Sequence, residues 1–211
     1  MRVASSIAFL LVASLAAPLA QAAGTILVVG DSLSAAYGID KQRGWVALLQ
    51  QRLQQESPGY HVVNASITGD TTRGGLSRLP AALERESPTM LILALGANDG
   101  LRGFPPERTR ENLRRMIRQA RDAGATVLLL GIKLPANYGR VYGEKFHRVY
   151  LDLATQEQVE LVPFFLEGVA ETRALMQADG VHPGVEAQPR ILENVWAALG
   201  PLLEGRQAAA P

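Results

Sequence analysis

The sequence predicts an α/β fold with three layers, in which helices cover both faces of a central parallel sheet. Short apolar runs rich in β-branched residues alternate along the chain with segments of helical period, as a parallel sheet with right-handed crossovers requires. Two of the runs, residues 89–96 and 125–131, are apolar almost throughout, which is typical of strands covered on both faces. The sequence shows no internal repeat and no long linker, so we expect one domain over residues 23–205.

Five apolar runs are expected to form the sheet. The first, TILVVG, stops at Gly30, and the third and fourth also stop at a glycine. Aliphatic and β-branched residues favour strands, whereas glycine and small polar residues favour the turns that follow them. The expected strands are residues 25–30, 61–66, 89–96, 125–131 and 159–162.

The segments between these runs show helical spacing. Four apolar residues from Trp45 to Leu53 are spaced i, i+3, i+4 and i+8, which places them on one helical face. Pro80 interrupts a similar pattern and should reset or kink that helix, because proline has no backbone N–H to donate. Trp45 and Trp196 are expected in the core. The expected helices cover residues 44–56, around 76–83, 106–123 and 141–157, with a last one that begins near residue 191.

The N-terminus has the features of a secretion signal. Arg2 supplies a positive charge, an apolar stretch follows, and the AQA sequence at 20–22 has the small-x-small form of a signal peptidase site. The apolar stretch is short for a membrane span of about 20 residues, and Pro18 lies at its end. We therefore expect residues 1–22 to be cleaved and the mature protein to be periplasmic or secreted, without stable membrane insertion. The last residues, 206–211, are expected to be a frayed tail.

The charge balance gives no support for nucleic acid as a partner. Arg2 is the only charged residue before Ala23, so the expected mature chain keeps 20 of the 21 basic residues against 20 acidic ones. A net charge near zero, without a basic run, is unlike that of a nucleic-acid-binding protein. The chain has no cysteine, and its three histidines are scattered, so neither thiolate chemistry nor a metal-ligand motif is indicated. We expect no cofactor and no metal.

Polar residues follow several of the expected strands, at the edge where open α/β sheets bind ligands. Ser32 follows the first strand, Gly69 the second and Asn98 the third. After the last strand, Asp179 and His182 stand in the loop ADGVHPG. A hydroxyl, an imidazole and a carboxylate are the groups that hydrolysis through an acyl-enzyme needs, because serine requires a base and the base must be oriented.

His182 is the histidine best placed to act as that base. It lies in a loop punctuated by glycine and proline, with Asp179 three residues before it. Gly180 permits a tight turn, which would bring the carboxylate to the imidazole N–H. The other histidines, His61 and His147, fall within a strand pattern and a helical pattern. Alone, the Asp179–His182 pair also fits a surface turn or half of a metal site.

Three hydrogen-bond donors are available for the negative oxygen that forms at an attacked carbonyl. They are the Ser32 amide, the Gly69 amide and the Asn98 carboxamide. Gly69 has no side chain, so a substrate can approach its N–H closely. Alone, Ser32 also fits a helix N-cap and Asn98 a turn, and we expect Asp31 and Asp99 to hold the neighbouring loops in place.

The four motifs together resemble a known family. GDSLS at 30–34, Gly69 in ITGDTT, GAND at 96–99 and DGVHP at 179–183 are similar, in this order, to the four blocks of the SGNH (GDSL) hydrolases. The stretches NASITGDTTRGGLSRLP, GANDGLRG and LPANYG resemble one branch in particular, the bacterial periplasmic esterase, acyl-CoA thioesterase I and lysophospholipase group. The resemblance implies a flavodoxin-like α/β/α sandwich with a five-stranded parallel sheet.

The resemblance also implies a role for each motif. Ser32 corresponds to the nucleophile, His182 to the base and Asp179 to the residue that orients the base. The oxyanion-hole donors correspond to Ser32, Gly69 and Asn98. The implied substrates are carboxylic esters, among them aryl esters, together with acyl-thioesters and lysophospholipids.

The substrate pocket and the substrate itself are less well defined by the sequence. Leu101 and Phe104 in GLRGF and Tyr138 in PANYG are candidates to line the pocket, although each also fits a plain loop. Two alternatives stay open: a carbohydrate O-acetylesterase that uses the same triad, and a periplasmic binding protein without catalysis. A nucleotide-binding domain is excluded because no glycine-rich phosphate loop follows the first strand. We expect a monomeric serine ester hydrolase.

Overall fold

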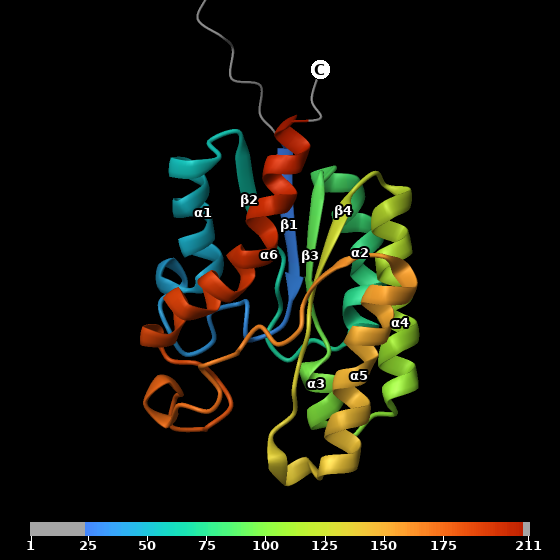
Figure 1. The fold of residues 1–211 in the computed structure, drawn as a ribbon, viewed down its shortest axis with the longest axis vertical. Helices are drawn as coiled ribbons and strands as arrows, with labels where there is room; N and C mark the ends of the chain where they lie inside the picture. The colour runs from blue at the N-terminus through green and yellow to red at the C-terminus, as the bar shows by residue number, and fades with distance from the viewer. Residues whose placement is uncertain (1–23, 209–211) are drawn as a thin grey trace, which may run out of the picture.

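A single parallel sheet forms the centre of the molecule (Figure 1). The structure is a computed structural model that describes residues 24–208. The strand order is β2-β1-β3-β4-β5, so the chain starts inside the sheet, moves to one edge and then crosses to the other. This order confirms the predicted fold class. The strands are β1 (Gly24–Gly30), β2 (Tyr60–Asn64), β3 (Met90–Ala94), β4 (Thr126–Leu130) and β5 (Glu160–Val162).

Helices cover both faces of the sheet (Figure 1). On one face α1 packs against α6, and on the other α2, α4 and α5 form a row. The remaining helix, α3, is a short segment directly after β3. The helices are α1 (Trp45–Glu56), α2 (Thr72–Glu86), α3 (Ala97–Leu101), α4 (Pro106–Asp122), α5 (Arg140–Glu157) and α6 (Gln188–Ala208).

The core lies between the sheet and these two layers of helices. Every residue of β3 is buried, and Ile26 to Val29 of β1 have no exposed surface. The paired strands are in register: Val28 of β1 lies opposite Ile92 of β3, and Gly30 lies opposite Ala94. The carboxyl ends of the two central strands therefore stop at the same level, where the loops that follow them can meet.

Pro80 and Pro201 lie inside helices, α2 and α6, rather than at their ends. The sequence pattern predicted a reset or kink at Pro80, but α2 runs through it without a break from Thr72 to Glu86. Pro80 is exposed, so the carbonyl of Leu76 that it leaves unpaired can face solvent, while buried Leu79 on the other side packs into the core. The packing of the buried face outweighs the missing hydrogen bond.

The C-terminal helix differs from the prediction at its end. It continues to Ala208, so residues 206–208 are helical and only 209–211 of the expected tail lie outside the described residues. Arg206 in this last turn donates a hydrogen bond of 2.9 Å to the Thr126 hydroxyl at the start of β4. Trp45 is buried as predicted, whereas Trp196 is only partly buried and lies beneath the guanidinium of Arg52. The expected signal segment, residues 1–22, lies outside the described residues.

The buried stripe of α6 provides a test of the core. Leu203 has 1% of its surface exposed, whereas its neighbour Leu202 is only partly buried. We expect Leu203→Ala to lower the free energy of unfolding by about 2–5 kcal/mol, because the change removes buried methyl groups and leaves a cavity. Leu202→Ala, the matched control, should cost clearly less. Urea unfolding of both variants measures the difference, and equal losses would show that the end of α6 does not pack as described.

Candidate active site

The loops that follow the strands bring four motifs to one edge of the sheet (Figure 1). Ser32 lies two residues beyond the end of β1, and Asn98 lies in α3, directly after β3. His182 and Asp179 come from the long segment between β5 and α6. Because the strands are parallel, their carboxyl ends share this edge, and residues distant in sequence meet there.

Three side chains form a continuous chain of hydrogen bonds. Nε2 of His182 lies 2.9 Å from Oγ of Ser32, and Nδ1 of His182 lies 2.7 Å from Oδ2 of Asp179. An ionised carboxylate only accepts, so Nδ1 carries the proton and Nε2 is left free to accept one from the hydroxyl. This is the arrangement of a nucleophile, a base and an orienting group.

The turn that holds Asp179 also keeps it ionised. The backbone N–H groups of His182 and Val181 donate to Oδ1 of Asp179 at 3.0 and 2.9 Å. The backbone hydrogen bond from His182, its side-chain hydrogen bond and the bond from Val181 together hold the pKa of Asp179 well below its ordinary value. Gly180 adopts a φ of +68° in this turn. The carboxylate therefore stays an acceptor for the imidazole even in acid.

Backbone and side-chain donors lie beside Ser32 as well. Among the described residues, neither the Ser32 amide nor the Gly69 amide donates to a protein acceptor. Gly69 has a φ of +77°, a conformation that side-chain-bearing residues rarely adopt, and no atom lies within 4 Å of where a Cβ would stand. The Asn98 carboxamide makes one long contact, 3.4 Å, to Asp31. All three groups thus retain donor capacity for a negatively charged oxygen.

A mainly apolar cleft of about 510 Å³ opens beside these residues. Ser32, Asn98 and His182 form part of its wall. Its apolar walls come from α3, from the loop after β4 and from the long segment after β5. Principal apolar lining residues are Leu101, Ile132, Leu134, Phe164, Leu166 and Met176.

The three residues predicted for the substrate pocket have different positions. Leu101 lines the cleft, but Phe104 and Tyr138 are not among its lining residues. Phe104 is half-buried under the guanidinium of Arg108, and its carbonyl accepts a 2.8 Å hydrogen bond from the hydroxyl of Tyr142. Tyr138 lies in a short 3₁₀ turn, Ala136–Tyr138. The lining of the cleft therefore does not support the expectation that Phe104 and Tyr138 form part of it.

The other two histidines take no part in the hydrogen bonds between Ser32, His182 and Asp179. His61 is exposed on the edge strand β2, with Nε2 3.0 Å from the hydroxyl of Thr25. Nδ1 of His147 lies 3.1 Å from the carbonyl oxygen of Ile132. Within residues 24–208, no group of three or more His, Asp or Glu side chains is arranged to hold a metal ion.

A comparison with protein-family models shows which family the chain belongs to. A model of the GDSL-like lipase/acylhydrolase family matches residues 28–188, which span all four motifs. The chain belongs to this family. The family resemblance drawn from GDSLS, ITGDTT, GAND and DGVHP is thereby confirmed. The prediction that the chain is an enzyme is confirmed as well.

Similar proteins include named esterases. The esterase TesA of Pseudomonas aeruginosa is 60% identical over 182 residues, which cover 86% of this chain and 90% of that protein. A protein of Escherichia coli named thioesterase 1/protease 1/lysophospholipase L1 is 46% identical over 184 residues, 87% of either chain. The structure of the psychrotrophic esterase EstA from Pseudoalteromonas, inhibited by monoethylphosphonate, is 39% identical with a TM-score of 0.81, covering 85% of this chain and 98% of that one.

In this GDSL hydrolase, Asp31 is a buried carboxyl directly behind the nucleophile. Its Oδ1 accepts a 3.0 Å hydrogen bond from the Leu33 amide, and its Oδ2 faces the Asn98 carboxamide. Burial raises the pKa of Asp31 to about 7, and the hydrogen bonds from Leu33 and Asn98 oppose that rise. The expected structural role of Asp31 takes a specific form: it connects the loop of Ser32 to the side chain of Asn98.

Asp99 connects the same short helix to α2. Its two carboxylate oxygens accept from the Thr72 backbone N–H at 2.8 Å and from the Thr72 hydroxyl at 2.6 Å. Asn112 of α4 donates to that hydroxyl at 3.0 Å. The buried network fixes the start of α2 against α3, and with it the distance between the Gly69 loop and Asn98.

Two further groups at the site were not anticipated from the sequence. Arg78 of α2 donates to the carbonyls of Ala65 and Gly30, at 2.5 and 3.3 Å, and to Asp70 at 2.8 Å, so one guanidinium joins the ends of β1 and β2 to the Gly69 loop. The ring of Tyr37 lies 4.4 Å from that of His182, centroid to centroid. Tyr37 lies seven residues after Gly30, the last residue of β1, and its place in the loop after that strand is the only sequence signal for it.

The buried Asp31 carboxyl predicts a pH dependence of stability. Its folded pKa is raised above the ordinary value of 3.8, so ionisation between about pH 4 and pH 7 costs the folded state free energy. The unfolding free energy of the wild type should therefore lose on the order of 3–4 kcal/mol over this interval through this group, at about 1.4 kcal/mol per pKa unit. Asp31→Asn cannot ionise and should lack that loss.

The measurement is urea unfolding of the wild type and Asp31→Asn at pH 4.5 and pH 8, with the exposed Asp122→Asn as the control. The wild type and Asp122→Asn should lose the same free energy of unfolding between pH 4.5 and pH 8. Asp31→Asn should lose less than either, so that its stability relative to both rises toward pH 8. Parallel curves for all three proteins would show that Asp31 is ionised without cost in the folded state.

Proposed function

We propose that this chain is a serine ester hydrolase that cleaves carboxylic esters and acyl-thioesters through an acyl-enzyme on Ser32. The observation that supports it most directly is the unbroken hydrogen-bonded chain from Ser32 through His182 to Asp179, beside an apolar cleft. The relatives whose names are esterase, arylesterase and thioesterase 1/lysophospholipase L1 support the same class of reaction. Ester hydrolysis is thus the shared activity of the group to which the chain belongs.

In the first step the hydroxyl of Ser32 attacks the acyl carbonyl. A serine hydroxyl is unreactive at neutral pH, so Nε2 of His182 accepts its proton as the Oγ–C bond forms. Asp179 holds the imidazole with Nδ1 protonated and stabilises the positive charge that the ring acquires. The electron pair of the carbonyl moves to its oxygen, which becomes an oxyanion.

The oxyanion is stabilised by three donors. We assign this role to the amides of Ser32 and Gly69 and the carboxamide of Asn98, which retain donor capacity in the loops after β1, β2 and β3. Because the donors are held before the substrate arrives, they act on charge that exists only near the transition state. The contact between Asn98 and Asp31, 3.4 Å long, restricts the carboxamide before the substrate arrives.

The acyl-enzyme then forms and is hydrolysed. His182 gives its proton to the leaving alcohol or thiol as the carbon–oxygen or carbon–sulfur bond breaks. A water molecule next loses a proton to His182 and attacks the acyl-enzyme, and collapse of the second intermediate returns the proton to Ser32. The product is the free carboxylic acid, and the triad is restored.

The cleft favours an acyl chain longer than acetate. Its lining includes Ser32 together with the apolar side chains of Leu101, Leu134, Phe164 and Met176. Burial of methylene groups contributes about 0.8 kcal/mol each, so affinity should rise with chain length until the cleft is full. This supports esters, thioesters and lysophospholipids with acyl chains over the alternative of a carbohydrate O-acetylesterase.

The proposed protein works outside the cytoplasm as a monomer, after cleavage of residues 1–22. The signal-like composition of these residues supports export. Between Gly24 and Ala208 there is no helix whose length and apolar character would let it span a membrane. The described residues, 24–208, form a continuous hydrophobic core, which supports a mature chain that begins at Ala23.

Replacement of the triad residues tests the reaction. Ser32→Ala and His182→Ala should each lower kcat by a factor on the order of 10⁶ on a p-nitrophenyl ester, and the double variant should be little worse, because the residues act as a unit. Ser34→Ala is the matched control: the hydroxyl is buried two residues away and makes no hydrogen bond among the described residues, so activity should be largely retained.

Labelling by an organophosphonate separates this enzyme from a binding protein. The wild type and Ser34→Ala should be labelled at one serine, and Ser32→Ala should not. A wild type that is neither labelled nor active on any ester would favour the non-catalytic alternative. Loss of labelling in Ser34→Ala with its retention in Ser32→Ala would move the nucleophile to Ser34.

Asn98 provides a separate test of the oxyanion donors. Asn98→Ala should lower kcat by about 10²–10³ with a small change in KM, because the carboxamide acts mainly in the transition state. Asn98→Asp should be worse, because a carboxylate repels the oxyanion. Asn194→Ala, which removes a carboxamide that donates to the carbonyls of Phe165 and Glu167, should affect stability only. A near-wild-type kcat for Asn98→Ala would remove Asn98 from the oxyanion site.

A further inference from the structure

The exposed large hydrophobic side chains of residues 24–208 all surround the catalytic edge. They are Tyr37, Ile67, Val141 and Val181, with 47%, 52%, 60% and 36% of their surface exposed. They follow the carboxyl ends of β1, β2, β4 and β5, in that order. Single exposed hydrophobic residues are ordinary on a protein surface, but these four all lie in segments at the same edge of the sheet. The opposite end of the sheet, where β1 begins and α6 ends, carries none among the described residues (Figure 1).

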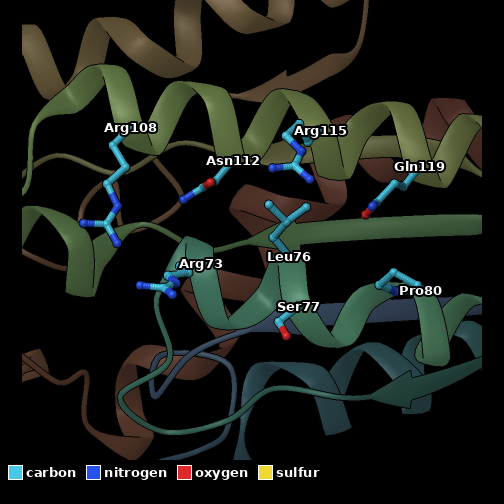
Figure 2. Close-up of a pocket in the computed structure, with 8 residues that line it drawn as sticks. All are labelled: Arg73, Leu76, Ser77, Pro80, Arg108, Asn112, Arg115 and Gln119. Carbon is cyan, nitrogen blue, oxygen red and sulfur yellow. The ribbon is translucent and has the colours of Figure 1, made fainter.

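A basic groove lies next to this edge, between α2 and α4. It has a volume of about 560 Å³ and is lined by Arg73, Arg108 and Arg115, and no acidic residue takes part in the lining. Figure 2 shows Arg108 and Arg115 projecting from α4 toward α2, with Arg73 at the beginning of α2. Leu76 forms part of the floor between them.

The arginines of the groove are free of acidic partners within the described part of the chain, unlike others on the same helix. Arg110 pairs with Asp152 at 3.2 Å, and Arg114 and Arg118 pair with Glu157 at 3.1 and 2.9 Å. The α4 arginines that face α5 are thus neutralised, and those that face the groove are available to an external anion. Guanidinium groups bind phosphate oxygens through paired hydrogen bonds.

The groove opens toward the catalytic edge. α2 and α4 both begin there, so their positive dipole ends add to the charge of Arg73 and Arg108. The Arg102 guanidinium donates at 2.9 Å to the carbonyl of Gly69, and that of Arg108 lies over the ring of Phe104. Positive charge therefore extends from the groove to the loops beside the catalytic serine.

We propose that the catalytic edge docks on an anionic phospholipid surface. The exposed apolar side chains enter the boundary between headgroups and acyl chains, and the arginines of the groove bind the lipid phosphates. Peripheral binding of this kind combines buried apolar area with electrostatic attraction to anionic lipid. This proposal goes beyond hydrolysis, because the surface would bind lipid whether or not the enzyme hydrolyses that lipid. Docking in this way turns the mouth of the cleft toward the lipid.

The attraction is local rather than a property of the whole molecule. Asp40 and Glu171 in the loops of the same edge, and Glu107 in the first turn of α4, have no ion pair among the described residues. The edge as a whole is therefore mixed in charge. The far end of the interface between α2 and α4 is lined by Glu84 and Asp122. The anion is therefore expected at the catalytic end of the groove, where the arginines gather.

The test is sedimentation of the chain from Ala23 onward with lipid vesicles, in a Ser32→Ala background so that no lipid is hydrolysed. Vesicles of phosphatidylcholine with phosphatidylglycerol are compared with pure phosphatidylcholine, at low and high salt. The parent should bind the anionic vesicles more tightly, and salt should weaken that binding.

Single replacement of Arg73, Arg108 or Arg115 by Gln should weaken binding to anionic vesicles about fivefold, since a basic residue near an anionic surface contributes about 1 kcal/mol. Arg85→Gln, at the other end of α2, is the matched control and should bind like the parent. Val141→Ser should weaken binding to both kinds of vesicle, because it removes apolar area. With Ser32 intact, these variants should hydrolyse a soluble p-nitrophenyl ester at near-wild-type rates.

Two results would overturn the proposal: no binding of the parent to anionic vesicles, or equal binding by the groove variants and Arg85→Gln. Both are independent of catalysis. A failure of ester hydrolysis would instead contradict the proposed function and leave the vesicle measurement unaffected. Thermal midpoints of the variants show whether any loss of binding comes from unfolding.

Discussion

The hydrogen bond between Oγ of Ser32 and Nε2 of His182 is the contact on which the site depends. It is 2.9 Å long and joins residues 150 positions apart. A contact of this length tolerates little displacement of either group, so both loops must be fixed by the fold. The sheet supplies that constraint: β1 and β3 are buried and in register, and their carboxyl ends stop at one level. Ser32 follows β1 by two residues, and the turn around Asp179 fixes the imidazole from the other side.

Buried polar groups hold the loops that helices and strands leave free. Asp31 faces Asn98, Asp99 binds the start of α2, and Arg78 joins the strand ends to the Gly69 loop. Each of these groups pays a desolvation cost, which hydrogen bonds in a low-dielectric interior offset. The raised pKa of Asp31 shows that the compensation is incomplete at that position. In spite of this cost, Asp31 connects the loop of Ser32 to Asn98 and so restricts the movement of the two loops relative to each other.

The surroundings of the triad combine two kinds of surface. Inside, the cleft presents the apolar side chains of Leu101, Leu134 and Phe164 to an acyl chain. Outside, exposed hydrophobic residues lie at the same edge of the sheet, and the arginines between α2 and α4 have no acidic partner within residues 24–208. An amphiphilic substrate has the same division into an apolar chain and a polar head. The distribution of side chains around the catalytic edge thus matches the chemical character of lipid esters, which the family membership by itself would leave unspecified.

The sequence by itself determined the alternation of strands and helices, because periodicity is a local signal. Motifs such as GDSLS and DGVHP also predicted which residues form the hydrogen-bonded chain of Ser32, His182 and Asp179. Hydrophobic pattern also placed α4 almost to the residue. Only the tertiary structure decided the rest. The helix continues through Pro80 because packing of Leu79 outweighs one lost hydrogen bond. Of the three residues predicted for the substrate pocket, Leu101 lines the cleft, whereas Phe104 and Tyr138 do not. Arg78, Tyr37 and the basic groove depend on side chains from separate elements meeting in space, and no spacing along one chain segment encodes such a meeting.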